Sequence, residues 1–202
     1  MSSAASAVSV SANSQTRPRE RILAAASDLF YRNGIRAVGV DAIAEAAGTN
    51  KMTLYRHFDS KDELVAEYLR CLAAEVGHFW DDLAAAHPRD ARARLRGWLA
   101  AMEAHVVDAD QRGCALANAA IELPDKDHPA RRVIEEFKAA QRDRLIALCG
   151  ATGADEPELL ADELFLLLEG ARVSVQSVGP NGPASRLVRM GEALIASHLA
   201  PA

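Results

Sequence analysis

The stretch GTNKMTLYRHFDSKDEL, residues 48–64, contains the turn and the helix that decide the fold. One helical pattern, VDAIAEAA, ends at residue 47, and a second short one, NKMTLYRHF, begins at residue 50. Gly48 lies between them, and glycine adopts the positive φ of a tight turn at little cost. A helix, a tight turn and a second helix follow the helix-turn-helix plan.

Small and apolar residues suit the crossing of these two helices. Ala44 is small where the helices would cross, and Ile43, Ala47 and Leu54 would supply their shared core. This spacing turns one face of each helix inward and leaves the other in solvent. The outward face would carry Met52 together with donors and charged groups, namely Asn50, Lys51, Thr53, Tyr55, Arg56, His57 and, in the next helix, Lys61.

These donors predict a nucleic-acid partner. A major groove admits one α-helix, and side chains of this kind reach base edges and phosphates. Lys61 would lie in the first turn of a helix that Ser60 opens, where the helix dipole disfavours a cation. A phosphate partner would explain that lysine. The pattern alone leaves one alternative open, which is an ordinary helical hairpin with a polar face.

Helical patterns continue along the rest of the chain, so the sequence predicts an all-α fold. Apolar residues recur three, four and seven apart, Pro and Gly mark the ends, and no period-two strand or internal repeat interrupts them. We expect a disordered tail over residues 1–16, a three-helix DNA-binding domain over 17–63, and a helical domain for regulation and dimerisation over 64–202. The expected helices of the last region cover about 60–86, 89–109, 114–123, 129–150, 155–178 and 183–199.

The composition fits a globular protein in a reducing compartment. Of the 202 residues, 50% are hydrophobic and 25% are charged, as in ordinary globular domains. Three cysteines without a C-x-x-C pair favour the cytoplasm over a disulfide framework. The histidines have no zinc spacing, and no apolar run approaches the ~20 residues of a membrane span. The sequence therefore predicts no metal, no cofactor and no membrane partner, and its start is a poor signal peptide.

The charge is unevenly distributed along the chain. The net charge is −5, which by itself disfavours a nucleic-acid partner. Residues 15–63, however, hold eight Lys or Arg against seven Asp or Glu, whereas residues 64–202 hold 15 against 21. The acidic balance thus belongs to the C-terminal region, and an anion site would depend on local placement.

The N-terminal third resembles a known family. The stretch ILAAASDLFYRNGIRAVGVDAIAEAAGTNKMTLYRHFDSKDELVAEYL, residues 22–69, resembles the DNA-binding region of the tetracycline-repressor (TetR) family. The similarity lies in LF-x-x-x-G, D-x-IA-x-AAG and above all TLYRHF-x-SK-x-EL. It implies a ligand-responsive regulator, most simply a repressor, that binds a palindromic double-stranded DNA operator as a dimer.

The resemblance also implies roles for single residues. Bases or the groove wall would be contacted by Lys51, Met52, Tyr55 and His57. Phosphates would be held by Thr53, Tyr55, Arg56 and Lys61, contacts that fix register without reading sequence. Two positions depart from the family pattern. Thr49 stands where valine is usual, and Gly39 stands where a Thr or Ser often caps the second helix and touches phosphate.

Two C-terminal apolar stripes allow a homodimer through the last two helices, as the resemblance implies. The stripe within ELFLLLEGARVSV comprises Leu164, Leu167, Leu168, Ala171 and Val175, with Gly170 permitting close approach. The stripe of the final helix comprises Leu187, Val188, Met190, Leu194 and Ile195. The alternative is that both stripes belong to the core of one subunit.

Large apolar residues and a few polar ones could form a small-molecule cavity in the C-terminal region. The candidates are Phe79, Trp80, Trp98, Met102, Cys114, Asn118, Phe137, Phe165, Glu169, Arg172 and Gln176. Such residues also build ordinary helical cores. Glu169 and Arg172 are three apart, so they either pair with each other or orient a polar ligand.

Other functions leave weaker signals. Arg112 and a helix start near Gly113 would both lower the pKa of the Cys114 thiol, which permits a redox or electrophile sensor. A helical enzyme is disfavoured because the chain lacks G-x-S-x-G, a Walker loop, H-E-x-x-H and a functional carboxylate pair. A helical interaction protein that has lost DNA binding is disfavoured because the exposed donors are present.

Overall fold

Every regular element of the molecule is helical in the residues that the computed structural model describes, 17–108 and 112–199. The all-α prediction is therefore confirmed, while the tail expected at residues 1–16 lies outside the described ranges. The helices are α1 (Pro18–Asn33), α2 (Val40–Ala46), α3 (Lys51–His57), α4 (Lys61–Ala86), α5 (Ala91–Val107), α6 (Ala115–Glu122), α7 (Pro129–Ala151), α8 (Pro157–Val178), the 3-10 turn η1 (Pro183–Arg186) and α9 (Leu187–His198).

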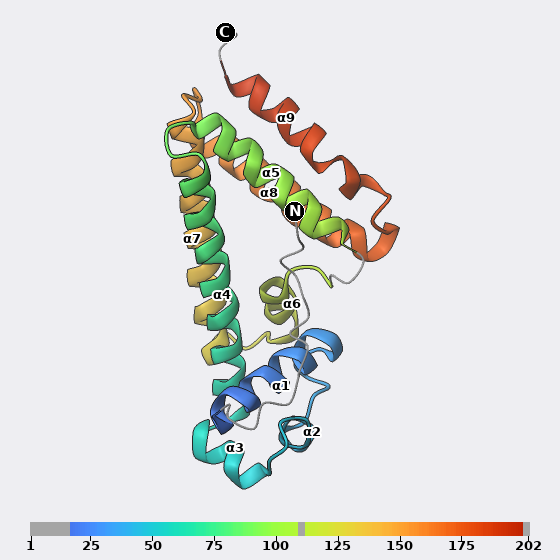
Figure 1. Ribbon diagram of the computed structural model, residues 1–202. Coiled ribbons are helices and arrows are strands. Elements are labelled where there is room, and N and C mark those ends of the chain that lie inside the picture. Colours follow the sequence, from blue (N-terminus) through green and yellow to red (C-terminus); the bar gives the residue numbers. More distant parts are fainter. Residues whose placement is uncertain (1–16, 109–111, 200–202) are drawn as a thin grey trace.

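The helices form two groups that one long helix connects. In Figure 1, α1, α2 and α3 lie at one end, and α5, α8 and α9 pack together at the other. The helix α4 starts in the first group and runs beside α7 towards the second. The short helix α6 lies between the two groups and packs against α7. This arrangement places the helix-turn-helix at one tip of the molecule.

Side-chain caps fix the helices of the helix-turn-helix. The turn residue Gly48 has a φ of +62°, as its position between the two helices requires. Asn50 caps α3 by accepting a hydrogen bond from the Thr53 N–H at 2.9 Å, and Ser60 caps α4 through the Glu63 N–H at 3.0 Å. Each cap satisfies an N–H group that the helix itself leaves without a partner.

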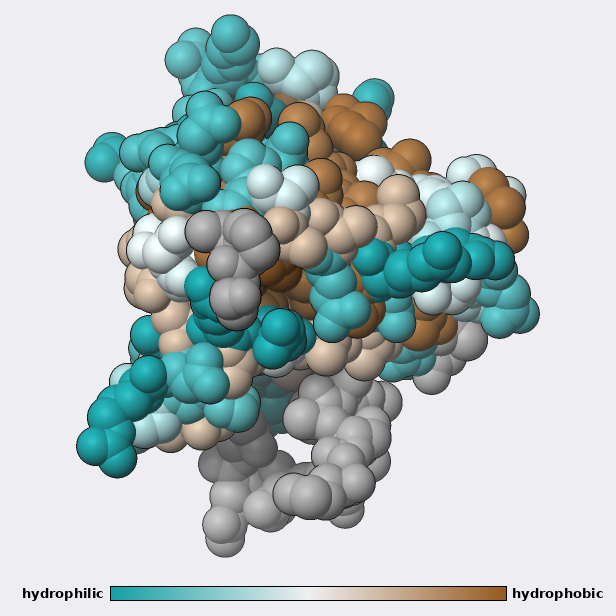
Figure 2. Space-filling model, turned by 90° about the horizontal axis from the view of Figure 1, so that it is seen from above, coloured by the Kyte–Doolittle hydropathy of each residue, from teal (hydrophilic) through white to brown (hydrophobic). Residues whose placement is uncertain are grey.

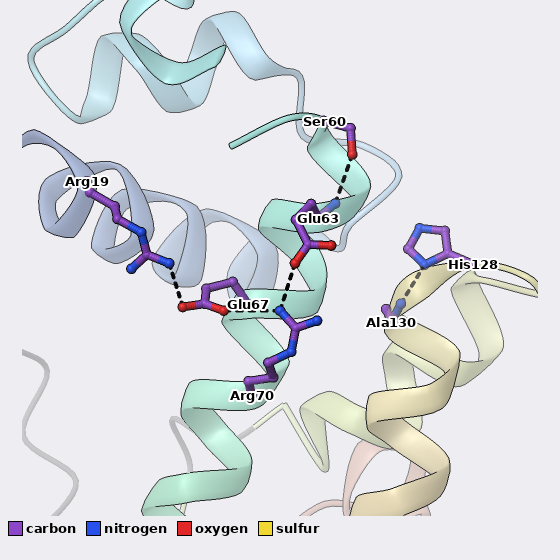
Figure 3. A network of polar contacts seen from close by, with 7 residues as sticks. All are labelled: Arg19, Ser60, Glu63, Glu67, Arg70, His128 and Ala130. Atoms are coloured by element: carbon purple, nitrogen blue, oxygen red, sulfur yellow. Dashed lines mark hydrogen bonds and ion pairs between the residues drawn. The ribbon is translucent and has the colours of Figure 1, made fainter. Parts of the chain in front are cut away.

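An ion-pair network attaches α1 to α4 near this cap (Figure 3). Arg19 contacts Glu67 at 2.6 Å, and Arg70 contacts both Glu67, at 3.1 Å, and Glu63, at 2.8 Å. Glu63 therefore has two roles: its backbone N–H takes part in the cap by Ser60, and its carboxylate pairs with Arg70. Hydrogen bonds from Arg19 and Arg70 hold the pKa of Glu67 below its usual range, although burial opposes them. These partly exposed pairs orient α1 more than they stabilise it.

Two hydrophobic cores fill the molecule. The first joins α1, α2, α3 and the start of α4 to residues of α6 and of the first turns of α7, namely Leu116, Ala119, Ala130 and Ile134. The second lies among α5, α7, α8 and α9, and Phe79, Trp80 and Leu83 of α4 pack against it. The helix α4 thus contributes to both cores, and the first core extends beyond residue 63.

The crossing of α5 and α9 depends on a glycine. A Cβ at Gly191 would lie 2.6 Å from Leu99 Cδ2, whereas a Cβ at Gly77, in the middle of α4, would meet no atom within 4 Å. We therefore expect Gly191→Ala to destabilise the fold by ~1–3 kcal/mol through overpacking. The matched Gly77→Ala should stabilise it by ~0.5–1 kcal/mol, because alanine is the better helix former. Urea denaturation followed by circular dichroism measures both, and equal effects would contradict the close packing at Gly191.

Candidate functional site

The helix α3 presents a polar face that the core holds firmly from behind. Leu54 is fully buried, and Phe58, directly after the helix, is 3% exposed. Arg19 of α1 lies over the Phe58 ring at 5.0 Å, which adds a cation–π contact. Met52 is 76% exposed and Tyr55 is 43% exposed. The predicted outward face is therefore present, on a helix whose orientation is fixed by buried anchors.

The groups on this face are weakly engaged within the protein. Lys51 lies 3.5 Å from Asp41, and both side chains are more than half exposed, so water screens this pair. Arg56 and His57 are exposed as well. Asn50 is an exception, because its side-chain oxygen already caps α3 and only its amide NH2 group remains as a donor.

The two residues that depart from the family pattern have ordinary conformations here. Gly39 caps α2 in an extended conformation, with a φ of −86° and no side-chain hydrogen bond. Thr49 is partly buried, and its N–H donates to the Ala44 carbonyl at 2.9 Å. A turn with threonine in place of valine therefore closes normally.

Lys61 has a partner inside the protein that the sequence argument missed. Its Nζ donates to the Ile35 carbonyl at 2.7 Å and lies 5.9 Å from the centre of the Phe30 ring. Burial lowers the pKa of this ammonium, although the charges of Asp62 and Glu122 oppose the shift. A phosphate is thus not needed to explain a lysine at the start of α4, because the hydrogen bond to the Ile35 carbonyl is sufficient.

The same peptide group of the α1–α2 loop is held from its other side by α6. The carbonyl of the Ile35–Arg36 peptide accepts from Lys61, and its N–H donates to the Glu122 carboxylate at 3.0 Å. This carboxylate also lies against Gly34, where an added Cβ would meet it at 3.1 Å and where φ is +84°. We call the contacts of Lys61 and Glu122 with this peptide the loop clamp. It ties the loop before the helix-turn-helix to both α4 and α6.

Arg112, which precedes α6, holds the end of α1. Its backbone N–H donates to the Tyr31 hydroxyl at 2.7 Å, and its guanidinium donates to the carbonyls of Tyr31 and Arg32. A cation suits a helix C-terminus because the last carbonyls carry partial negative charge. Two residues of the C-terminal region therefore hold this part of the chain: Arg112 binds the end of α1, and Glu122 binds the loop that follows it.

A cavity of about 360 Å³ lies between α4, α5, α7 and α8. Its aromatic wall contains Trp80 and Trp98, stacked with ring centres 6.3 Å apart. The Trp80 Nε1 group donates to the Gln141 side chain at 2.6 Å, which fixes the plane of the indole. The predicted candidates that line this cavity are Phe79, Trp80, Trp98, Met102, Phe137, Phe165 and Arg172.

A charged cluster lies beside the cavity wall. Glu169 accepts from Lys138 at 2.7 Å and from Arg172 at 2.7 Å, so the expected pair of Glu169 and Arg172 is present. Burial alone would raise the pKa of Glu169, but the two cations outweigh it and hold that pKa below its usual range. Burial and the charge of Arg172 lower the pKa of His105, although the charge of Asp108 opposes them, so the neutral imidazole is favoured. The cluster therefore contains two cations and one carboxylate.

Four predicted candidates do not line this cavity: Glu169, which lies in the charged cluster beside it, and Cys114, Asn118 and Gln176. Asn118 and Gln176 line a separate hollow of about 300 Å³ between α1, α6 and α8, and Asn118 donates to the Arg112 carbonyl. Cys114 is the N-cap of α6, which begins at Ala115 and not at Gly113. Placing Cys114, Asn118 and Gln176 with the tryptophans was wrong. Cys114 and Asn118 belong to the α6 segment, which packs in the first core, and Gln176 of α8 lines the hollow beside α6.

The cavity also has polar residues that the sequence reading missed, chiefly Lys138, Gln141 and His105. A signal for Gln141 was available, since it stands four residues from both Phe137 and Leu145 on the inward stripe of α7. Trp80 would also need an acceptor for its N–H group if it were buried. No local pattern marked Lys138, whose partner Glu169 lies 31 residues further along the chain.

The other two thiols are not activated. Burial raises the pKa of Cys149 to about 12, and burial together with the charges of Glu67 and Glu75 raises the pKa of Cys71. No group of three His, Cys, Asp or Glu residues suited to a metal ion occurs in the described ranges. Nor does any helix in those ranges have the length and apolarity to cross a membrane.

The helix α3 is anchored from behind and exposes several donors, and the other end of the fold holds a cavity. This combination defines a helix-turn-helix regulator. Residues 22–68 match the family model described as bacterial regulatory proteins, tetR family. A putative TetR transcriptional regulator from Streptomyces avermitilis is 33% identical in sequence, with a TM-score of 0.79 over 91% of this chain and 98% of that one. A TetR-family regulator from Streptomyces coelicolor gives a TM-score of 0.84 at 26% identity, over 90% and 95% of the two chains.

A shorter similarity concerns the N-terminal region. The transcriptional repressor KstR2 of Rhodococcus jostii is 48% identical over 52 residues, which are 26% of each chain. With the full-length similarity at 33% identity, these matches show that the chain belongs to the TetR family of transcriptional regulators. Its members are DNA-binding regulators, so the expectation that the chain is not an enzyme is confirmed.

The loop clamp can be tested by local exchange. Glu122→Ala removes the acceptor of the Arg36 N–H, so this amide should exchange with solvent about 10-fold faster, as expected for a lost hydrogen bond to a charged group. Glu136→Ala, which removes an exposed glutamate paired with Arg132 on α7, should leave that exchange unchanged. Hydrogen–deuterium exchange read by NMR measures both. An unchanged Arg36 amide in Glu122→Ala would show that the clamp does not hold the loop.

Proposed function

We propose that the protein is a ligand-responsive repressor that binds a palindromic operator as a homodimer in the cytoplasm. The observation that carries this proposal is the course of α4, which begins at the loop clamp and lines the cavity with Phe79 and Trp80. One helix thus contacts both the DNA-binding region and the candidate effector site. The repressor KstR2, similar in its N-terminal region, supports repression as the mode of action.

In this proposal α3 enters the major groove. Bases or the groove wall would be contacted by Lys51, Met52, Tyr55 and His57. Phosphates would be held by Thr53, Tyr55 and Arg56, together with Gly39 at the start of α2 and Thr49 just before α3. Asn50 would contribute only its amide NH2 group, because its oxygen caps the helix. Lys61 would reach phosphate as a second role, since an ammonium has three N–H groups and the Ile35 carbonyl takes one.

The proposed dimer surface differs from the stripes that the sequence suggested. Leu164, Leu168 and Ala171 belong to the second core of their own subunit. The exposed apolar residues of α8 lie on another face, with Leu159 47%, Leu166 71%, Val173 69% and Val178 64% exposed, while Met190 of the predicted α9 stripe is 46% exposed. Seen from above, this end of the molecule shows hydrophobic side chains gathered among polar ones (Figure 2).

The spacing of these exposed residues supports a helix partner. Leu159, Leu166 and Val173 stand seven apart, so they lie along one side of α8. Gly170 lies on the same side with open space above it, which permits a close helix approach. Apolar residues in such a continuous stripe mark an interaction surface more often than isolated ones do.

Dimer geometry explains how an effector would act on DNA. Two recognition helices enter successive major grooves only when they are about 34–36 Å apart. From Lys61 to Trp80 the helix α4 spans roughly 28 Å, so a small tilt at the cavity would displace the DNA-binding region by ångströms. An effector that binds the tilted state better by ~1–3 kcal/mol would weaken operator binding about 5–150-fold.

The reading of DNA by α3 can be tested with single substitutions. We expect Lys51→Ala and Tyr55→Ala to weaken operator binding by ~1–3 kcal/mol per lost base contact and to change the preferred base at particular positions. The control Arg132→Ala also removes an exposed cation, but on α7, and should change neither. Selection from random DNA, followed by fluorescence anisotropy at fixed salt, measures preference and affinity. Identical selected motifs for all three variants and the wild type would refute the assignment of α3.

The dimer surface can be tested by adding charge to the exposed stripe. Leu166→Glu and Val173→Glu should give folded monomers, because a carboxylate buried in an apolar interface is costly. Ile121→Glu, at an equally exposed apolar residue of α6, should leave the dimer intact. Light scattering after size exclusion gives the mass, and circular dichroism gives the folding. A wild-type monomer at micromolar concentration would contradict the dimer.

A further inference from the structure

The charged cluster beside the cavity is not balanced. Lys138 and Arg172 share the single carboxylate of Glu169, with side chains that are only 21%, 18% and 27% exposed respectively. His105, on α5, lies close enough to Arg172 that this cation disfavours a charge on the imidazole. Glu75, on α4, is exposed to water and forms no ion pair with either cation in the described part of the chain. One positive charge is therefore left over at this end of the cavity, where water only partly screens it.

Apart from the water-exposed carboxylate of Glu75, the polar groups of the wall offer more donors than acceptors. Gln141 uses its carbonyl to accept from Trp80, which leaves its amide NH2 group as a donor. Lys138 gives one of its three N–H groups to Glu169. Arg172 gives Nη1 to the same carboxylate, and its buried Nε has no hydrogen-bond partner among the described residues. A ligand that satisfies this wall must supply acceptors.

The rest of the wall is apolar and largely aromatic. It includes Phe79, Trp80, Trp98, Met102, Phe137 and Phe165. Rings of this kind bind flat apolar bodies through their faces and edges. A volume of about 360 Å³ lies at the small end of the range for ligand cavities, so the body must be compact.

Resting on the proposed ligand response, we infer that the effector is a compact organic acid with an aromatic body, whose carboxylate binds at Lys138 and Arg172. The carboxylate supplies the missing negative charge and accepts from the spare donors of both cations. The aromatic body lies against the two tryptophans. A lipophilic cation of the same size would instead meet two positive charges that a single glutamate cannot neutralise.

Tryptophan fluorescence gives a direct measurement of this site. The chain has two tryptophans, and both line the cavity, so a change in their emission reports binding there. Three probes share one skeleton and differ in charge: para-tert-butylbenzoate, its methyl ester and para-tert-butylbenzylamine. The benzoate should bind about 10- to 100-fold tighter than the ester, as expected for hydrogen bonds to a charged group, and the ammonium should bind weakest.

A pair of variants on α7 assigns the preference to the cluster. Lys138→Met should reduce the ratio of benzoate to ester affinity about tenfold. Arg142→Met, one turn further along α7, removes a cation that also pairs across to α8, at Asp162, but lies outside the cavity, and it should keep the wild-type ratio. Because each ratio is measured within one variant, a general loss of folded protein cancels from it.

The outcomes separate the two proposals. Equal affinity for benzoate and ester, a preference for the amine, or an unchanged ratio in Lys138→Met would overturn the organic-acid class and leave the ligand cavity standing. Binding of none of the three probes, by fluorescence and by calorimetry, would count against the cavity as a ligand site and so against the ligand response itself.

Discussion

The structure depends on one constraint, which is that α4 must pack in two cores at once. The apolar face of its first turns, with Leu64, Val65 and Leu69, is fully buried with α1, α2 and α3, and its second half lies against α5 and α7. A helix propagates rotation and translation along its length because its backbone hydrogen bonds are continuous. The two cores are therefore joined by one continuous helix, and neither core can shift its share of α4 independently.

The loop clamp adds a second connection to the same region. Lys61 belongs to α4 and Glu122 belongs to α6, yet both hold the peptide between Ile35 and Arg36. The helices α4 and α6 must therefore move together, or one of the two hydrogen bonds is lost. Arg112 makes the connection broader, since it holds the end of α1 by way of the Tyr31 and Arg32 carbonyls. Local geometry thus ties the position of α3 to two parts of the C-terminal region.

Much of the fold could be predicted from the sequence because it depends on local signals. Apolar spacing located the helices, and Gly48 and Ser60 marked a turn and a helix start that the structure confirms. Boundaries were less certain. The helix α7 continues past Gly150 to Ala151. The last helix, expected from residue 183, is preceded by the 3-10 turn Pro183–Arg186 and begins only at Leu187. Local propensity gave way to packing at these ends.

The candidate site was predicted only where local pattern sufficed. The exposed face of α3 follows from helical periodicity around Leu54, and most of the aromatic residues of the cavity follow from large side chains on inward stripes. Contacts between distant segments could not be read in the same way. Glu122 and Arg36 are 86 residues apart, and which face of α6 meets which core depends on the path of a loop. For the same reason Cys114, Asn118 and Gln176 were grouped with residues that they do not adjoin.

The first core has a consequence for exchanging parts between regulators. Leu116, Ala119, Ala130 and Ile134 pack in the same core as Phe30 and Tyr68, although most of the chain between them belongs elsewhere. A hybrid that joins residues 17–63 to an unrelated C-terminal region would thus separate residues that pack in one core, because the boundary at residue 63 is not a linker between two independent cores. The transferable unit is discontinuous: the recognition region keeps its own packing only if α6 and the start of α7 accompany it. Substitution on the exposed surface of α3 accordingly leaves this core intact, whereas recombination of whole segments divides it.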